Sequence, residues 1–491
     1  MKKAIVIGSG IGGLSAAVRL AAKGFDVKVF EAKEFLGGKL SQIEQDGYRF
    51  DAGPSVFTLP QIIDELIQYA GKNPKDYFDY EKLDESFRYF WVDGTRLTYY
   101  HDQAKLKQEI ETKLNTSFEP VAKYQEKAAL LFEKNYPLFL EKSLHKIGTY
   151  FSKEAIATLP HLHRFDLFKT MHEANVKHFE HPKLVQMFDR FATYNGSNPF
   201  MAPGVLNMIS HLESRIGTYF PKGSMIGITN SVVKLAKDLG VEFIMNTKVD
   251  EIVVQNKQVK GVRIGQEKYD ADVVVSNSDV YFTYNELLKN QGIKSKAAEQ
   301  ERSSSGIIFY LGIKKEFKEL GLHNFFFSDN MEEEFDHIFN KKIVYDDPSI
   351  YINITSKYNK DDAPEGCENW FLMMNAPAND GSQDWDEQTE KAYRVMLDKV
   401  SKQLGTDVEQ YIETKTFLNP PKIKERTNSY QGSIYGTSSN AKMSAFFRHS
   451  NYSKKIKGLY FSGGSVHPGG GIPLSVLSSK IMVENMREVR N

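Results

Sequence analysis

The sequence predicts an α/β protein that begins with a β-α-β unit, and three observations near the N-terminus carry this prediction. Residues 4–7 form an apolar stretch typical of a buried strand, residues 13–23 follow a helical pattern, and residues 27–30 form a second apolar stretch. This order predicts two parallel strands joined by a helix. Further strands are predicted at 241–245, 249–254, 259–264, 272–276, 305–313 and 349–354, and residues 458–490 predict a strand, a glycine-rich turn and a helix.

The bulk composition limits the possible functions. At 491 residues the chain needs two or three structural units, and its 63 basic and 63 acidic residues leave no net charge that would attract nucleic acid. The single cysteine, Cys367, excludes an intramolecular disulfide, and its polar surroundings favour an incidental thiol over a catalytic one. We expect neither a nucleic-acid partner nor a metal site.

The N-terminus predicts a strand rather than a targeting segment. The apolar run after Met1 is much shorter than the hydrophobic part of a signal peptide, and no small-residue cleavage site follows it. Nowhere do roughly 18 to 20 apolar residues run uninterrupted, as a membrane-spanning helix would need. We therefore expect a cytoplasmic protein, for which peripheral attachment to the inner face of the cell membrane stays open.

A glycine-rich turn, Gly8-Ser9-Gly10-Ile11-Gly12-Gly13, joins the first predicted strand to the helix. Its spacing provides a tight turn, a close approach to a pyrophosphate and close packing of helix on strand, while the helix N-terminus offers free amides to phosphate. Glu31, followed by Ala32, ends the next strand, where a carboxylate accepts hydrogen bonds from ribose hydroxyls. A 2′-phosphate would meet a like charge there, so the turn predicts a dinucleotide other than NADP.

Two further segments extend this pattern. Gly37-Gly38-Lys39 follows Glu31, and Asp51-Ala52-Gly53-Pro54-Ser55-Val56 comes soon after. Together they resemble the flavin amine oxidase superfamily, in which the paired glycine and the following basic residue close over the pyrophosphate. The resemblance implies FAD as the cofactor. An ordinary solvated role for Lys39 is the alternative.

The last glycine-rich turn runs from Gly463-Gly464 through His467-Pro468 to Gly471-Ile472-Pro473 and precedes a helix. Proline suits the first turn of a helix, where its missing N–H is no loss. The positive end of that helix would favour the negative charge that reduced flavin gains. In the superfamily both glycine turns belong to one domain, which implies that the middle of the chain is inserted, and Val249 matches a position whose backbone contacts adenine.

Over essentially its whole length the chain resembles the bacterial-type carotenoid desaturases. The most specific segment is His467 to Pro473, supported by Tyr219 to Gly223. The block 190–200 and Gly463 to His467 look more like 1-hydroxycarotenoid 3,4-desaturases than phytoene desaturases. The resemblance implies FAD-dependent removal of hydrogens from a polyene, with oxygen or a quinone as the electron acceptor.

The resemblance also implies a domain arrangement. An FAD-binding domain would comprise 1–85, 221–300 and 425–491, and an α+β substrate domain would comprise 86–119, 152–220 and 301–424. Residues 120–151 would form a helical segment, kinked at Pro137, which rests on the membrane surface that stores carotenoids. A solvated lysine-rich face is the ordinary alternative for that segment.

Candidate catalytic and substrate residues are few. A polyene has no acidic proton, so flavin N5 would accept a hydride from it. The sequence does not identify the residue that would act as the base. His467 is a weak candidate, because a packed loop histidine explains it as well, and Asp51 is expected to cap the Gly53 turn. Aromatic residues between 120 and 211 suit either a core or an apolar tunnel, for which the candidates are Phe191, Tyr194 and Phe200.

Two other classes of protein share this scaffold. An amine oxidase would act on a soluble polar substrate and would need a smaller aromatic cage, which the His467 to Pro473 turn does not support. A prenyl-binding escort protein would have lost flavin, whereas this chain keeps both glycine turns and Glu31. A yellow purified protein would separate an enzyme from an escort.

Overall fold

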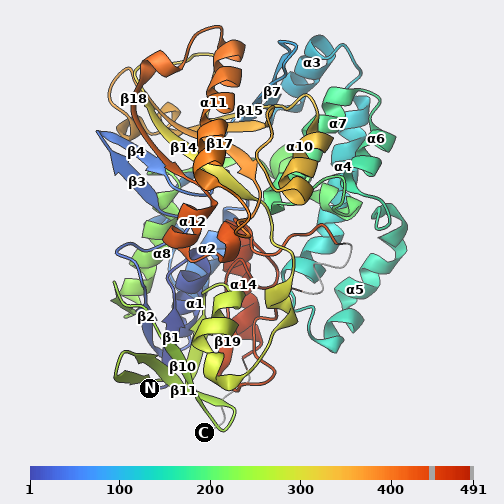
Figure 1. The fold of residues 1–491 in the computed structure, drawn as a ribbon. Helices are drawn as coiled ribbons and strands as arrows, with labels where there is room; N and C mark the ends of the chain where they lie inside the picture. The colour runs from blue at the N-terminus through green and yellow to red at the C-terminus, as the bar shows by residue number, and fades with distance from the viewer. Residues whose placement is uncertain (442–447, 487–491) are drawn as a thin grey trace.

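The computed structural model describes residues 1–441 and 448–486. Residues 442–447 and 487–491, which were included in the predicted 425–491 part of the FAD-binding domain, lie outside the described residues. A five-stranded sheet occupies the lower half of Figure 1 and a seven-stranded sheet the upper half, and a group of helices flanks both on the right.

The five-stranded sheet is wholly parallel and has the order β19-β13-β1-β2-β9. Its central strands are buried, as expected for a parallel sheet covered on both faces. The sheet gathers strands from distant parts of the chain: β1 (Lys3–Ile7), β2 (Asp26–Phe30), β9 (Glu242–Ile244), β13 (Val273–Ser276) and β19 (Leu459–Phe461). The predicted α/β class and the first β-α-β unit are therefore confirmed.

Four helices share one apolar core with this sheet: α1 (Ile11–Ala22), α2 (Gln61–Tyr69), α8 (Ile226–Asp238) and α14 (Ile472–Glu484). Helices α1 and α14 pack directly on each other and are buried over most of their length. The guanidinium of Arg19, buried in this contact, donates to Glu65 of α2 at 2.5 Å and to Ser479 of α14 at 3.1 Å. This side chain therefore joins the first and last helices of the chain.

The seven-stranded sheet has the order β18-β14-β17-β16-β15-β6-β7 and is antiparallel except between β15 and β6. Helix α11 (Trp385–Leu404) packs on one face over an apolar core, and α10 (Met331–Asp336) and α12 (Pro420–Thr427) lie nearby. The strands are β6 (Glu85–Phe90), β7 (Arg96–Tyr100), β14 (Ser305–Ile313), β15 (His323–Phe326), β16 (Ile350–Ile354), β17 (Glu368–Ala376) and β18 (Ile412–Leu418).

The flanking helices are α3 (Gln103–Lys113), α4 (Glu119–Asn135), α5 (Lys153–Thr158), α6 (Met171–His178) and α7 (Pro182–Asp189). The α-helix ends at Asn135, before Pro137 as predicted, and the chain continues directly into a π-helical turn, Tyr136–Leu140, that contains this proline. The apolar face of α4 packs into a core with α6 and α7. On its outer face Lys123 pairs with Glu119, and Lys127 pairs with Asp166.

The smaller elements surround these two sheets. They are the hairpin β3 (Gln42–Gln45) and β4 (Tyr48–Asp51), the pair β5 (Tyr80–Lys82) and β8 (Tyr219–Pro221), the sheet of β10 (Glu251–Gln255), β11 (Gln258–Ile264) and β12 (Glu267–Asp270), and α9 (Val280–Phe282). Val249, predicted inside a strand, lies instead in the connection before β10. Thr247 donates its N–H to the carbonyl of Glu31, so this connection follows the end of β2.

All strands of the five-stranded sheet come from the ranges predicted for the FAD-binding domain, 1–85, 221–300 and 425–491. The division into domains itself stays a prediction. In the part of the chain that the structure describes, no helix is both long and apolar enough to cross a bilayer.

Candidate functional site

A cavity of about 1400 Å³ runs along the carboxyl ends of the parallel strands. Its wall includes residues that directly follow β1, β2, β13 and β19, which is where ligands bind in open α/β sheets. The predicted cofactor residues line it, except Gly13: Gly8, Ser9, Gly10, Gly12, Glu31, Ala32, Gly38, Lys39, Gly53, Pro54, Ser55, Val56, Val249, Gly464, Gly471, Ile472 and Pro473.

Two glycines of the first turn, Gly12 and Gly13, are packed too closely for a side chain. A Cβ atom on Gly13 would lie 2.2 Å from the carbonyl oxygen of Gly8, which explains why Gly13 serves helix packing and not the cavity wall. A Cβ atom on Gly12 would lie 2.6 Å from the Cα atom of Gly463. The two glycine turns, more than four hundred residues apart in sequence, therefore touch through their backbones.

Hydrogen bonds strengthen this contact between the turns. The hydroxyl of Ser462 donates to the carbonyl of Gly12 at 2.8 Å, and the side-chain amide of Asn277 donates to the carbonyl of Ser462 at 2.6 Å. Asn277 stands at the end of β13 and also lies against Gly10. Sequence reasoning missed Asn277; its place directly after an apolar strand was the available signal.

Glu31 occupies the position expected of a ribose-binding carboxylate. Its side chain is 9% exposed and accepts hydrogen bonds from the backbone N–H of Ser9 at 2.8 Å and of Lys33 at 2.9 Å. The hydroxyl of Ser9 also donates to it at 2.6 Å. These bonds hold the carboxylate at the cavity wall while leaving it lone pairs for a ligand.

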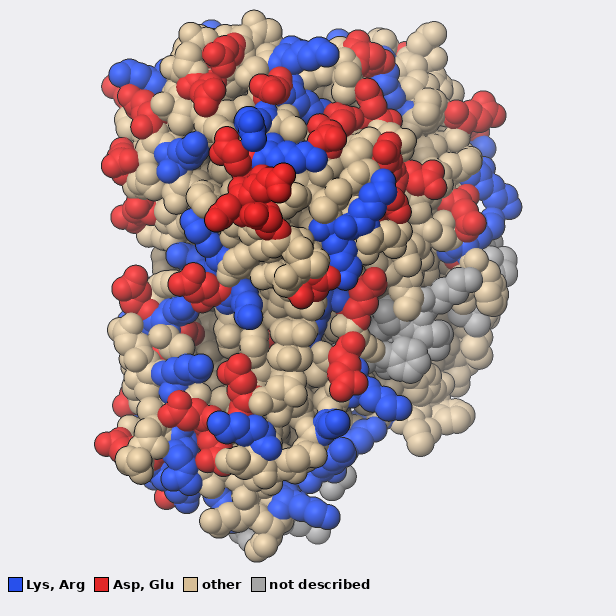
Figure 2. All heavy atoms as spheres, in the orientation of Figure 1, with Lys and Arg blue, Asp and Glu red and all other residues tan. Residues whose placement is uncertain are grey.

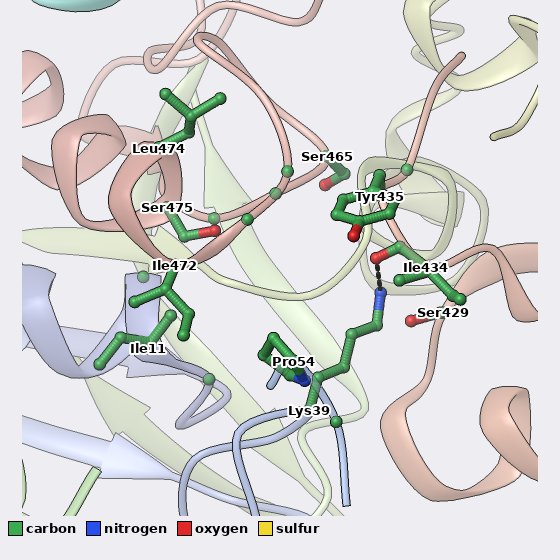
Figure 3. A pocket seen from close by; sticks show the side chains of 18 of the residues that line it. Ile11, Lys39, Pro54, Ser429, Ile434, Tyr435, Ser465, Ile472, Leu474 and Ser475 are labelled. Carbon is green, nitrogen blue, oxygen red and sulfur yellow. Dashed lines mark hydrogen bonds between the residues drawn. The ribbon is translucent and has the colours of Figure 1, made fainter. Parts of the chain in front are cut away.

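The second glycine turn leads into helix α14 at the opposite wall. Figure 3 shows Ile472 and Ser475 at the start of this helix, across the pocket from Pro54 and Lys39 of the N-terminal part of the chain, whereas Leu474 points away from them. Gly471 precedes the helix and Pro473 lies in its first turn, as predicted. The N-terminal ends of α1 and α14 both open on the cavity, which places two positive helix ends around one ligand space.

Lys39 extends its amine across the cavity wall. The Nζ atom donates to the carbonyls of Ser433 at 3.0 Å and Ile434 at 2.6 Å, and Figure 3 shows the bond to Ile434. Burial lowers the pKa of Lys39 to about 8. Its predicted role at the pyrophosphate stays a prediction, and the simple solvated role does not fit this geometry.

His467 is 2% exposed, and its Nε2 atom lies 2.8 Å from the carbonyl of Lys142. Burial lowers the pKa of His467 to about 4, and it lowers the pKa of the neighbouring His449 to about 4 as well. A neutral ring that is hydrogen-bonded to a carbonyl suits a packed loop histidine better than a catalytic base.

Asp51 does not cap the Gly53 turn as expected. It accepts hydrogen bonds from the N–H groups of Met225 and Ile226 at the start of α8 instead.

Of the three predicted tunnel residues, only Tyr194 lines the cavity. Phe191 is 2% exposed and packs in the core of the flanking helices, and Phe200 packs on the ring of His172. Phe191 and Tyr194 belong to the helical turn Arg190–Asn195. Arg190 and Tyr194 lie on the side of this turn that faces the cavity, so Phe191 points away from the cavity. Both cavity residues bond to buried Glu213, and the Arg190 guanidinium lies 2.8 Å from that carboxylate.

Away from the predicted cofactor residues, the wall of the cavity becomes aromatic. Its aromatic end is lined by Phe87, Tyr194, Phe325, Tyr351 and Phe371. Other parts of the wall are apolar, including Phe132, Phe139, Leu140, Phe165 and Phe168. One continuous space therefore joins glycine turns suited to a dinucleotide with walls suited to a long apolar ligand.

Residues 11–486 match the model of a family described as flavin containing amine oxidoreductase. The chain belongs to this family. It is 47% identical over 488 residues to a 1-hydroxycarotenoid 3,4-desaturase of Flavobacterium sp. (strain P99-3), with 99% of each chain covered. It is 33% identical over 503 residues to a 4,4'-diaponeurosporene oxygenase of Staphylococcus aureus (strain bovine RF122 / ET3-1), covering 100% of this chain and 99% of that protein.

A solved structure of putrescine oxidase bound to putrescine superposes with a TM-score of 0.63 at 13% identity, and 98% of each chain is covered. This likeness shows a shared fold alone.

The family match and the curated relatives confirm the predicted resemblance to carotenoid desaturases and the predicted FAD-dependent oxidoreductase. The cofactor is FAD. The residues present fit it, since Glu31, the two glycine turns and two helix N-termini all border one cavity.

The buried histidines predict that acid weakens the second glycine turn. The pKa of His467 in the folded protein lies below the ordinary value of 6.5, so its contribution to stability is present above about pH 6.5 and is lost as the pH falls towards 4. The loss would be about 3 kcal/mol at most. We expect FAD fluorescence to report cofactor release over this range. His467→Gln, which keeps a donor for Lys142 but does not titrate, should need more acid; identical release curves would contradict this role.

Proposed function

We propose that the protein is a carotenoid desaturase that forms the C3–C4 double bond of a 1-hydroxycarotenoid. The observation that carries the proposal is the continuous cavity, in which predicted flavin-binding turns open directly into apolar walls. The 47% identity to a 1-hydroxycarotenoid 3,4-desaturase over 99% of both chains supports the same substrate class. The alternative within the family is a phytoene desaturase.

The proposed site residues divide by the part of the cavity they line. Gly8 to Gly12, Glu31, Gly464 and the start of α14 would hold FAD, with Gly13 supporting the turn by packing. Tyr194 and the aromatic end would hold the polyene. The domain division predicted from the sequence is retained here as part of the proposal.

The protein contributes orientation and a dry environment to the reaction. When bound, FAD supplies the acceptor for the hydride that leaves the substrate, and the second hydrogen leaves as a proton. The apolar walls align the polyene and exclude water from it, which favours a reactive geometry. The helix ends of α1 and α14 favour negative charge near the cofactor, and oxygen or a quinone would serve as the final electron acceptor.

Product analysis tests this function directly. FAD-loaded protein in liposomes would be incubated with a 1-hydroxycarotenoid or with phytoene, in air or with a quinone. We expect the hydroxylated substrate to lose two hydrogen atoms by mass spectrometry and to absorb at longer wavelength, because its conjugation is extended. Desaturation of phytoene but not of the hydroxylated substrate would contradict the subtype, a gain of oxygen would indicate an oxygenase, and turnover of a primary amine instead would contradict the class.

We also propose that the protein attaches peripherally to the cytoplasmic membrane face, through a patch different from the one expected. The apolar face of α4 is buried, so segment 120–151 has little to offer a bilayer before residue 147. The exposed apolar side chains lie further along, and we name them the apolar patch: Ile147, Phe151, Ile156, Leu159 and Phe168, with exposed fractions of 79%, 75%, 60%, 61% and 87%.

The apolar patch is connected to the cavity. Phe168 lines the cavity together with Phe165 and Leu167, so a substrate dissolved in lipid could pass from the patch to the cavity without crossing water. Figure 2 shows mainly uncharged residues at the lower right of the molecule, below the atoms drawn in grey, where Figure 1 places α5, which carries part of the patch. The exposed Lys146 and Lys153 flank the patch and suit anionic headgroups.

Liposome flotation tests this attachment. The triple variant Ile147→Ser, Phe151→Ser and Phe168→Ser should lose at least about tenfold in vesicle binding, since each change removes exposed apolar area that would enter lipid. The control variant Ile343→Ser and Tyr358→Ser changes exposed apolar residues elsewhere and should float like the parent protein. Equal flotation of all three proteins would contradict the patch.

A further inference from the structure

A short chain of hydrogen bonds interrupts the aromatic end of the cavity. The hydroxyl of Ser55 donates to the phenol oxygen of Tyr351 at 2.9 Å, and that oxygen lies 2.7 Å from Nδ1 of His323. Ser55 and Tyr351 line the cavity, whereas His323 lies behind them and is 2% exposed. Polar groups in such an apolar wall are costly unless they are hydrogen-bonded, as these three are to one another.

The direction of these hydrogen bonds follows from His323. The side-chain NH2 of Asn353, which can only donate, lies 3.2 Å from Nδ1 of His323, so Nδ1 carries no proton and its lone pair is shared between Asn353 and the closer phenol of Tyr351. Burial lowers the pKa of His323 to about 3, which keeps the ring neutral, and its Nε2 atom has no partner among the described residues. Burial also raises the pKa of Tyr351, so the phenol keeps its proton and donates it to Nδ1.

The direction of these hydrogen bonds determines whether Ser55 can donate to a ligand in the cavity or can only accept from it. Because the Tyr351 proton points to His323, the Tyr351 oxygen accepts the proton of Ser55. The Ser55 oxygen then has only lone pairs left for a ligand. A ligand that satisfies it must bring a hydrogen-bond donor.

We propose that Ser55 is the recognition site for the substrate hydroxyl, with Tyr351 and His323 as the residues that orient it. This inference rests on the proposed function. The hydroxyl-bearing C1 is two carbons from C3, so whatever recognises the hydroxyl must lie beside the reacting bond. Ser55 meets this condition, since it directly follows Gly53 and Pro54 in the wall of the proposed flavin site.

The arrangement predicts discrimination between closely related polyenes. An alcohol donates its proton to Ser55, whereas a methyl ether or a hydrocarbon has none to donate. Either of the latter leaves the Ser55 oxygen desolvated without a partner, which costs more than the bond itself contributes. Sites of this kind reject the analogue that lacks the hydrogen-bonding group.

Variants of the chain separate recognition from structure. Ser55→Ala removes the acceptor. Tyr351→Phe keeps the ring that packs against Phe87 and Phe371 but frees the Ser55 proton to turn into the cavity. Ser356→Ala is the matched control, because its buried hydroxyl has no partner among the described residues and does not line the cavity.

The test measures equilibrium binding and kinetics of FAD-loaded protein with a 1-hydroxycarotenoid, its 1-methyl ether and the unsubstituted polyene. We expect the parent protein and Ser356→Ala to favour the alcohol. Ser55→Ala should lose about tenfold in kcat/KM for the alcohol, mainly through KM, and little for the other two ligands. Tyr351→Phe should bind the methyl ether closer to the alcohol. All variants should keep the flavin content and spectrum of the parent.

Three results would overturn the proposal. Equal losses for all three ligands, or a changed flavin spectrum in Ser55→Ala, would show that Ser55 serves the cofactor or the fold. Equal binding of alcohol and ether by the parent would show that no hydroxyl site exists. Binding is independent of turnover, so selective binding without desaturation contradicts the proposed function alone, while unselective desaturation contradicts this inference alone.

Discussion

The backbone contact between Gly12 and Gly463 is the constraint on which the rest of the molecule depends. The Ser462 hydroxyl and the Asn277 amide hold it in place with bonds of 2.8 and 2.6 Å. A side chain on Gly12 would collide with the backbone of Gly463, and a side chain on Gly463 would collide with the amide of Asn277. Because helices α1 and α14 start from these turns, the contact also decides where two positive helix ends face the cavity.

The inserted middle of the chain builds on that junction. The seven-stranded sheet and the flanking helices supply the aromatic end and the apolar walls, and the parallel sheet supplies the cofactor side. Arg190 in this wall is paired with the buried carboxylate of Glu213, which offsets the cost of burying its charge. A cavity that is apolar at one end and rich in backbone amides at the other suits oxidation of a hydrocarbon by a bound flavin.

Local patterns in the sequence predicted the parts of the site that depend on backbone. Three such patterns are the glycine spacing, the carboxylate at the end of the second strand and the proline at the start of the last helix. Each depends on only a few neighbouring residues, so it can be recognised in the sequence alone. Asn277 was missed because its partners lie far away in sequence. The same holds for Tyr351 and His323. Ser55 was predicted as a cofactor residue, but its contact with Tyr351 was not, because the two residues come from separate segments and meet only after the seven-stranded sheet has formed.

Amphipathic patterns were less reliable guides to what faces a ligand or a membrane. Phe191 and Phe200 are aromatic neighbours of Tyr194, yet both pack in the core, because the turn directs only some of its positions to the cavity. The lysine-rich helix α4 suggested a membrane surface, but its apolar face meets α6 and α7. The exposed apolar side chains follow it in short helical turns, where periodicity is too brief to detect.

Hydrogen–deuterium exchange tests most directly whether the two ends of the chain form one flavin site. Exchange would be compared between FAD-loaded and FAD-depleted protein, with strand β14 as an internal reference. We expect FAD to slow exchange of the amides at residues 8–14 and at residues 463–475 together, because both turns border the same ligand. Protection of the first turn alone, with the second unchanged, would contradict a shared site.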